Sequence, residues 1–221
     1  MFIYNFMAPR FSIIITTYNR ATLLERALNS LLNQRFQHWE AVIVNDGSTD
    51  ETDEIISSYL ASDTRFRYHK QNNQGEAKAK NKGVELAKGE YITFLDSDDA
   101  FEIGHLEKRD QILKKHPEID LLHGGVQIIG DEYVPDKNNT EQLIHLSECI
   151  IGGTFFIRNS CIQSLEGFKD IPLGTDSELF DRAVENNMRI LKTDLPTYIY
   201  HRTAKDSITH NYQKSEIRNK N

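Results

Sequence analysis

The first half of the chain alternates between short apolar runs and segments in which apolar residues recur every three or four positions. Runs rich in β-branched and aromatic residues, such as 11–17, predict strands that are buried on both faces of a sheet. Recurring apolar positions, such as 23, 24, 27, 28, 31 and 32, predict helices with one buried side. The predicted strands are 11–17, 39–46, 65–70 and 91–95, and the predicted helices are 21–32, a segment ending near 60, 75–89 and 103–115.

Because strand and helix alternate, the sequence predicts an α/β fold with a mainly parallel sheet. In such sheets ligands bind beyond the carboxyl ends of the strands. In the polar segment that follows the second strand, Ser48 or Thr49 is expected to cap the next helix. Three polar segments follow predicted strands at that edge: TTYNR at 16–20, NDGSTD at 45–50 and DSDD at 96–99. Burial explains the apolar strands, but it does not explain why polar residues gather at one edge.

The pattern continues to about residue 130 and weakens after it. Residues 121–129 predict one further strand, and the polar, turn-rich segment 131–142 predicts an exposed loop. Farther along we expect strands at 153–158, 188–192 and 196–202, a short helix ending near 165 and a longer helix from about 176. No internal repeat is present.

Composition and charge narrow the class of protein. Of the 221 residues, 38% are hydrophobic and 27% charged, as in soluble globular proteins. The net charge of −7 argues against general nucleic-acid binding, which needs a basic surface. The start lacks a signal-peptide pattern and no run approaches the ~18 apolar residues of a membrane span, so we expect a cytoplasmic protein. The mildly basic end, 214–221, leaves peripheral contact with the inner face of a membrane open. Cys149 and Cys161 lack a paired spacing and are expected to be reduced thiols.

The segment DSDD places three carboxylates, Asp96, Asp98 and Asp99, within four positions at the end of a predicted strand. Carboxylates this close repel one another unless a cation lies among them. With no thiolate nearby, these oxygen ligands suit a hard divalent ion, Mg²⁺ or Mn²⁺, which also holds substrate phosphates. The alternatives are a solvated acidic turn or a helix N-cap formed by Asp98 or Asp99. An Asp-x-Asp motif alone does not decide between them.

Four segments occur in one order along the chain: IIITTYNR, VIVNDGSTDET, NNQGEAKAKNKGVELAKGEYITFLDSDD and GTDSELFDRA. In this combination the chain resembles the family 2 glycosyltransferases, inverting enzymes of the GT-A fold, over roughly residues 11–202. The resemblance implies a Rossmann-like, mainly parallel central sheet flanked by helices, with a smaller acceptor-side region toward the C-terminus. It also implies a nucleotide-sugar-binding half at 1–100, an acceptor-binding and catalytic-base half at 101–202, and a tail at 203–221.

The resemblance implies a site for the nucleotide-sugar donor. Asp46 would accept a hydrogen bond from the base, although an Asp before glycine also forms turns. The family motif Gly-x-Ala-x-Ala-Arg-Asn has Lys80 in place of Arg here, which keeps the charge and loses the bidentate fork. Lys78 is a second candidate for that contact, and the alternative for Tyr18 is a core aromatic. The implied donor contacts are Thr17, Tyr18 and Arg20 around the base and phosphates, Asp46, Lys80, Asp96 toward the ribose or sugar, and Ser97.

The resemblance also implies a metal site. Asp98 would bind the divalent ion, Mn²⁺ or Mg²⁺, that bridges the diphosphate. His201 could complete the metal shell or touch the diphosphate, and Arg202 could neutralise phosphate charge. Asp99 is expected to be structural.

The catalytic base is implied by a family motif in which a Glu-Asp pair opens a helix. The matching residues here are Thr175 and Asp176, so Asp176 is the expected base and Glu178 is the second candidate. A base of this kind takes the proton of the acceptor hydroxyl, which is typically worth ~10²–10⁴ in rate. The alternative is that Thr175 or Asp176 only caps the helix.

Taken together, these motifs imply a metal-dependent hexosyltransferase. It would move a sugar from a nucleotide-sugar, by resemblance a UDP-sugar, to a saccharide or lipid-linked acceptor in cell-surface polysaccharide or glycolipid assembly. One alternative is an inactive nucleotide-sugar-binding module, which the departures at 80 and 175 would suit. Another is a magnesium-dependent DxD phosphatase, although that motif normally follows the first strand. A dinucleotide oxidoreductase is disfavoured because no GxGxxG follows the first strand.

Overall fold

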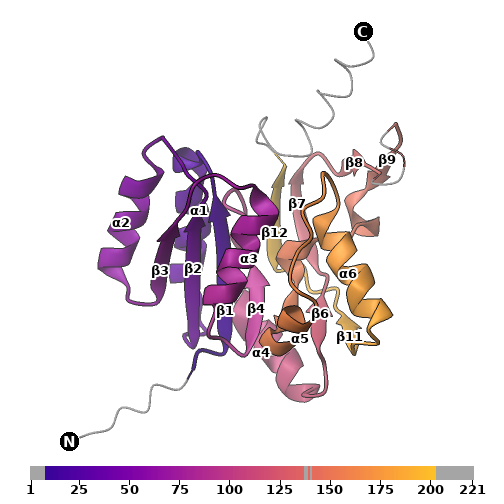
Figure 1. Ribbon diagram of the computed structural model, residues 1–221. Coiled ribbons are helices and arrows are strands. Elements are labelled where there is room, and N and C mark those ends of the chain that lie inside the picture. Colours follow the sequence, from indigo (N-terminus) through magenta and orange to yellow (C-terminus); the bar gives the residue numbers. More distant parts are fainter. Residues whose placement is uncertain (1–7, 137–138, 140, 203–221) are drawn as a thin grey trace, which may run out of the picture.

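Seven strands of the described part of the chain form the central sheet, in the order β11-β6-β10-β4-β1-β2-β3 (Figure 1). The computed structural model describes residues 8–136, 139 and 141–202. Neighbouring strands are parallel except that β10 runs antiparallel to both β4 and β6. The carboxyl ends of the other six strands therefore point to one edge. The strands are β1 (Phe11–Thr17), β2 (Trp39–Asn45), β3 (Phe66–Lys70), β4 (Tyr91–Phe94), β6 (Leu121–His123), β10 (Phe156–Arg158) and β11 (Ile190–Lys192).

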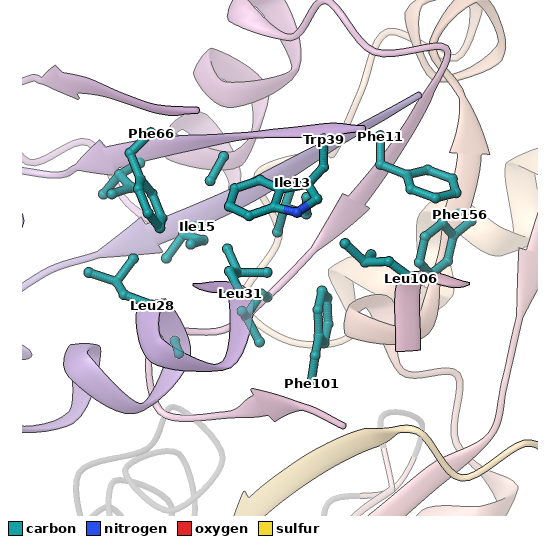
Figure 2. Close-up of a cluster of buried hydrophobic side chains, with 14 of the residues drawn as sticks. Phe11, Ile13, Ile15, Leu28, Leu31, Trp39, Phe66, Phe101, Leu106 and Phe156 are labelled. Atoms are coloured by element: carbon teal, nitrogen blue, oxygen red, sulfur yellow. The ribbon is translucent and has the colours of Figure 1, made fainter. Parts of the chain in front are cut away.

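Helices cover both faces of this sheet. Successive residues of a strand point to opposite faces, so each face of the sheet contributes to its own buried cluster. In β1, Phe11, Ile13 and Ile15 belong to the first cluster, which Figure 2 shows in part, and Ile14 belongs to the second. The first cluster includes residues of α1 (Ala21–Leu32), α2 (Thr52–Ser62) and α4 (His105–Lys115). The second includes residues of α3 (Glu76–Leu86), α5 (Asn159–Ser164) and α6 (Thr175–Glu185).

A smaller three-stranded sheet joins segments that are far apart in the chain, in the order β5-β12-β7. Its strands are β5 (Ala100–Phe101), β7 (Val126–Gly130) and β12 (Tyr198–Arg202). Because β12 pairs with β5, the last described strand lies beside the chain that follows the acidic segment. Among the described residues, the remaining elements are the antiparallel pair β8 (Tyr133–Pro135) and β9 (Leu143–His145) and two 3₁₀ turns, η1 (Leu146–Glu148) and η2 (Gly152–Thr154). In the described part of the chain, every helix is too short or too polar to traverse a lipid bilayer.

The predicted α/β fold is confirmed, and every element predicted before residue 115 is present. The single strand predicted at 121–129 is wrong, because Gly124 and Gly125 separate β6 in the main sheet from β7 in the small one. Their φ angles of +88° and +77° lie in the left-handed region that glycine adopts readily. A Cβ at Gly125 would also overlap the carbonyl of Leu195. The expected tail at 203–221, with its basic end at 214–221, lies outside the described residues.

Two smaller predictions are also wrong. The segment 131–142 is not wholly a loop, since β8 lies within it. Ser48 and Thr49 do not cap α2, which begins at Thr52 without a side-chain cap. The Ser48 hydroxyl instead accepts a hydrogen bond from the backbone N–H of Asn19 at 2.9 Å. That contact ties the segment after β2 to the segment after β1.

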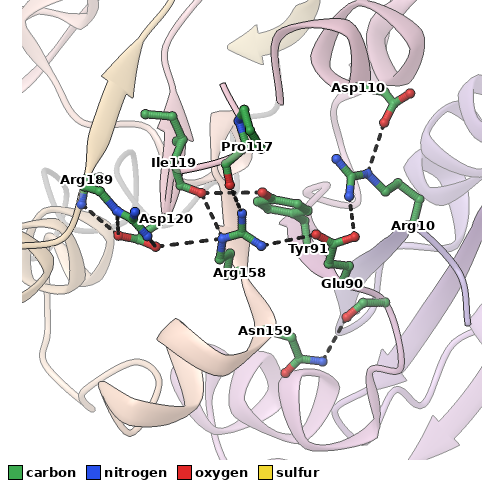
Figure 3. A network of polar contacts seen from close by, with 11 residues as sticks. Arg10, Glu90, Tyr91, Asp110, Pro117, Ile119, Asp120, Arg158, Asn159 and Arg189 are labelled. Carbon is green, nitrogen blue, oxygen red and sulfur yellow. Dashed lines mark hydrogen bonds and ion pairs between the residues drawn. The ribbon is translucent and has the colours of Figure 1, made fainter. Parts of the chain in front are cut away.

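An ion-pair network lies at the opposite edge of the sheet, where β4 begins (Figure 3). Arg158, at the end of β10, contacts the Glu90 carboxylate at 3.1 Å and the Ile119 carbonyl at 3.0 Å. Its guanidinium lies 4.9 Å from the ring centre of Tyr91, and that of Arg10 lies 4.8 Å from the same centre. Arg158 thereby holds the end of the antiparallel strand against the starts of its neighbours.

Replacing Arg158 by methionine should lower the free energy of unfolding by about 1–3 kcal/mol, because the Ile119 carbonyl and the Glu90 carboxylate lose a shared donor. Equilibrium unfolding in urea measures this change. The control is Lys82→Met, which removes a solvent-exposed pair with Glu85 and should cost at most about 0.5 kcal/mol. Equal losses in the two variants would contradict the role given to Arg158.

His123, at the end of β6, is buried in an uncharged state. It is 8% exposed, and its ring centre lies 4.9 Å from that of Phe180. Burial, together with the charges of Lys192 and Arg109, lowers the pKa of His123 from its usual 6.5 to about 4. As the pH falls below 6.5, the unfolded chain binds a proton here and the folded chain does not until about pH 4. The folded state therefore loses stability relative to the unfolded chain as the pH falls from 6.5 to about 4.

His123→Phe should flatten the pH dependence of the unfolding free energy between pH 6.5 and 4, by up to about 3 kcal/mol. Phenylalanine cannot titrate and retains the aromatic contact with Phe180. Urea unfolding at several pH values across the interval measures the slope. His116→Phe, at a side chain that is 39% exposed, is the matched control and should keep the wild-type slope. An unchanged slope in His123→Phe would show that another group is responsible.

Candidate active site

The three polar segments predicted at the carboxyl edge lie side by side. β1 lies between β2 and β4, with Thr17 opposite Asn45. The backbone N–H of Asp46 donates to the carbonyl of Thr17 at 2.9 Å. The segments that follow β1, β2 and β4 therefore leave the sheet at one edge, as the parallel strands require.

The acidic segment forms a tight turn in which the N–H of Asp99 donates to the carbonyl of Asp96 at 3.0 Å. Burial and neighbouring carboxylates raise the pKa of Asp96 to about 7, against the opposing charge of Lys80. Burial also raises the pKa of Asp98. The N-cap alternative does not hold, because α4 begins only at His105. Carboxylates in this state bind a cation favourably, since the cation offsets burial and mutual repulsion.

Asp99 connects the acidic turn to β12. The hydroxyl of Tyr198 donates to Asp99 Oδ2 at 2.6 Å, and the backbone N–H of His201 donates to Oδ1 at 2.7 Å. Asp99 has no exposed surface, and burial raises its pKa well above the usual range. Both oxygens therefore serve to hold β12, which agrees with the structural role expected for this residue.

The residues near the acidic turn suit a divalent ion whose remaining ligands come from the substrate and from water. Within residues 8–136, 139 and 141–202, no group of three or more His, Cys, Asp or Glu side chains is placed to hold an ion alone. Asp99 is engaged with β12, which leaves Asp98 and the His201 ring. Burial lowers the pKa of His201, so the ring is neutral near pH 7 and can act as a ligand. Mg²⁺ is commonly held by one or two protein ligands, waters and substrate phosphates, and this donor set suits that arrangement.

Asp176 lies in the first turn of α6 and faces two groups across the site. Its Oδ2 accepts a hydrogen bond from the N–H of Gly152 at 2.9 Å, and its Oδ1 lies 3.5 Å from Lys80 Nζ. A Cβ at Gly152 would overlap the Asp176 carboxyl group, so only glycine permits this approach. The capping alternative does not hold, because the N-cap is Gly174 and no side chain caps the helix.

Glu178, the second candidate for the base, is engaged elsewhere. Its Oε1 lies 2.8 Å from Arg182 Nε and 2.8 Å from Lys169 Nζ. The hydrogen bond from Arg182 is the main cause that lowers the pKa of Glu178. A carboxylate held in two ion pairs is a poor proton acceptor, so the geometry favours Asp176.

Lys80 is the cation of this part of the site. It is 4% exposed, and its Nζ lies 2.7 Å from Glu76 Oε1. Burial alone would lower the pKa of Lys80, but the carboxylates of Asp176, Glu76 and Asp96 outweigh burial and raise it well above its usual range. Lys78 is exposed and pairs with Asp170 at 3.5 Å, so it points away from this cluster.

The other expected donor contacts lie at or just after the ends of β1, β2 and β4, at the carboxyl edge of the sheet. Tyr18 is 47% exposed, so the core-aromatic alternative does not hold. Asp46 is buried, and its carboxylate accepts hydrogen bonds from Gln71 Nε2 and from the N–H groups of Gln74 and Gly75 at 2.8–3.0 Å. Asp46 thus organises the loop before α3. Thr17 and Ser97 are buried, and the backbone N–H of Arg20 contacts Thr52 Oγ1 at 3.4 Å.

Three residues that make contacts in the candidate site were not predicted from the sequence. Tyr198 is fully buried between the acidic turn and η2, and Gly152 positions Asp176. Both depend on contacts between distant parts of the chain. Glu76 could have been found, because it precedes Lys80 by four positions and so shares its helix face.

Proteins of known family are similar to this chain in sequence. The chain matches the model of the family described as glycosyl transferase family 2 over residues 12–165. Glycosyltransferase GlyG of Streptococcus pneumoniae is 31% identical over 161 residues, which are 72% of this chain and 50% of that protein. A GalNAc(5)-diNAcBac-PP-undecaprenol beta-1,3-glucosyltransferase of Campylobacter jejuni is 39% identical over 100 residues, 44% of this chain and 32% of that protein. The chain spans between about a third and a half of these relatives.

Solved structures share the fold. S. aureus TarS 1–349 in complex with UDP-GlcNAc matches with a TM-score of 0.76 and 24% identity, over 90% of this chain and 60% of that one. The mannosyltransferase PcManGT from Pyrobaculum calidifontis, in complex with GDP-Man and Mn²⁺, matches with a TM-score of 0.72 and 17% identity, over 94% and 61%. These likenesses confirm the expected GT-A fold. With the family match over most of its length, the chain belongs to glycosyl transferase family 2.

Proposed function

We propose that the protein is an inverting glycosyltransferase that moves a sugar from a nucleotide-sugar to an acceptor hydroxyl. The proposal depends on the position of the Asp176 carboxylate. It lies beside Lys80, whose ammonium also interacts with Asp96 in the acidic turn after β4. A candidate base thereby lies within reach of the residues expected to hold the donor. The donor contacts belong to the half at 1–100, and the base and acceptor contacts belong to the half at 101–202.

The reaction would proceed as one displacement at the anomeric carbon. Asp176 takes the proton of the acceptor hydroxyl as that oxygen attacks, and the nucleoside diphosphate leaves from the opposite face. Oδ2 of Asp176 retains a lone pair beyond its bond to Gly152, so it can accept the proton. Asp96 orients the ribose or sugar. A divalent ion bound by Asp98 and His201 would stabilise negative charge on the leaving diphosphate.

The donor and acceptor are proposed from the relatives. TarS binds UDP-GlcNAc and UDP, which supports a UDP-sugar donor, and PcManGT binds GDP-Man with Mn²⁺, which supports a metal. The Campylobacter jejuni relative acts on a lipid-linked saccharide, which supports a saccharide or lipid-linked acceptor. We accordingly propose a role in cell-surface polysaccharide or glycolipid assembly, in the cytoplasm or at the inner face of the membrane.

Asp176→Asn should lower kcat by about 10²–10⁴, because the amide keeps the shape of the side chain and cannot accept the proton. Release of UDP from a panel of UDP-sugars, with oligosaccharides as acceptors, measures the rate. Glu178→Gln is the comparison and should lose less than about tenfold, since Glu178 is engaged by Arg182. A larger loss in Glu178→Gln than in Asp176→Asn would reassign the base. If the wild type binds UDP and turns over no UDP-sugar, the inactive binding module is the better account.

UDP with Mn²⁺ should raise the melting temperature, because a ligand at 100 times its Kd adds about 2.7 kcal/mol to stability. For a chain of this size that corresponds to a shift of roughly 5–10 °C. Asp98→Ala should abolish the part of the shift that requires the metal and keep the part due to UDP alone. UMP, which lacks the second phosphate, is the control and should show little dependence on Mn²⁺. The donor-site assignment fails if no nucleoside diphosphate shifts the transition with any divalent ion.

A further inference from the structure

The ammonium of Lys80 is placed asymmetrically among the carboxylates of the site. Its Nζ lies 2.7 Å from Glu76 Oε1, which is hydrogen-bond distance, and 3.5 Å from Asp176 Oδ1, which is beyond the usual 2.7–3.2 Å. The same atom lies 5.2 Å from the ring centre of Phe168. Lys80 is thus bonded to Glu76 and only near Asp176.

The two oxygens of Asp176 have different surroundings. Oδ2 accepts the N–H of Gly152. Oδ1 is buried and has no hydrogen-bond partner within the described residues. Lysine carries three donors on a flexible stem, so its ammonium could reach Oδ1 if nothing held it back. A direct hydrogen bond there would stabilise the anion and weaken Asp176 as a proton acceptor.

We propose that Glu76 is a positioning residue that holds the Lys80 ammonium away from Asp176 Oδ1 and so preserves the proton-accepting capacity of Asp176. The inference rests on the proposed function, in which Asp176 is the base. Glu76 is the first residue of α3 and precedes Lys80 by one turn, so the two side chains meet on one helix face. The side chain of Glu76 is 34% exposed, whereas that of Lys80 is 5% exposed, so Glu76 draws the ammonium toward the rim of the site.

Glu76→Gln tests this role, because glutamine keeps the shape of the side chain and removes its charge. With the UDP-sugar that the wild type turns over fastest, kcat should fall about tenfold or more, while KM for that donor stays within about twofold. Glu85→Gln is the matched control: it makes the same change on α3, at an exposed pair with Lys82, and should keep the wild-type kcat. Melting temperature and UDP-binding stoichiometry give the folded fraction of each variant. Should Glu76→Gln not fold, Glu76→Asp, whose shorter side chain cannot hold the ammonium in place, should also lower kcat.

The effect should depend on Lys80. In a Lys80→Met background no ammonium can move onto Asp176, so adding Glu76→Gln should change kcat by less than about twofold. Independent, multiplying losses in the two variants would indicate a merely structural role for Glu76 and would overturn the inference, as would a wild-type kcat in Glu76→Gln. A wild type that neither binds UDP nor turns over any UDP-sugar contradicts the proposed function instead. If the wild type is active and Glu76→Gln keeps the wild-type kcat, only the positioning role is contradicted.

Discussion

The candidate active site depends on the ion pairing of one buried ammonium, that of Lys80, with the carboxylates around it. Removing a charge from water is costly unless an opposite charge lies close by. Lys80 meets this condition with Glu76 on its own helix and with Asp176 on α6, two helices that cover the same face of the sheet. The pairing therefore links the donor side to the candidate base, and it limits the electrostatic cost of placing Asp96 nearby.

The carboxylates at the two edges of the sheet have different electrostatic surroundings. Where β4 begins, Glu90, Asp110 and Asp120 each pair with an arginine, and the hydrogen bond from Arg189 lowers the pKa of Asp120. At the carboxyl edge, burial raises the pKa values of Asp96 and Asp98. The first edge stabilises the joint between strands from both halves of the chain. The second keeps carboxylates that a bound cation would neutralise, so the stabilising ion pairs and the proposed ligand site lie at opposite ends of the same strands.

The elements before residue 115 could be predicted because each follows a single periodicity over enough residues. The pair β6 and β7 could not be separated, because apolar residues flank the glycines at 124–125 and the turn depends on their left-handed backbones. Candidate site residues could be predicted where they are adjacent in sequence, as in the acidic segment. The bond from Tyr198 to Asp99 depends on the order of strands in the small sheet, which no local pattern carries. The spacing of Glu76 and Lys80 was visible, but the burial of Lys80 beside α6 was not.

Two adjacent glycines in η2 connect the acidic turn to the candidate base. The N–H of Gly152 holds Asp176, and Gly153 packs against the ring of Tyr198, which in turn donates to Asp99. A Cβ at either glycine would overlap the side chain that it faces, so both sides of the site are set by the path of one backbone turn. In addition, β10 from the second half of the chain pairs with β4 from the first within one sheet. The proposed boundary between donor and acceptor functions near residue 100 therefore cannot divide folding units, because neither half completes the sheet or the candidate site without the other.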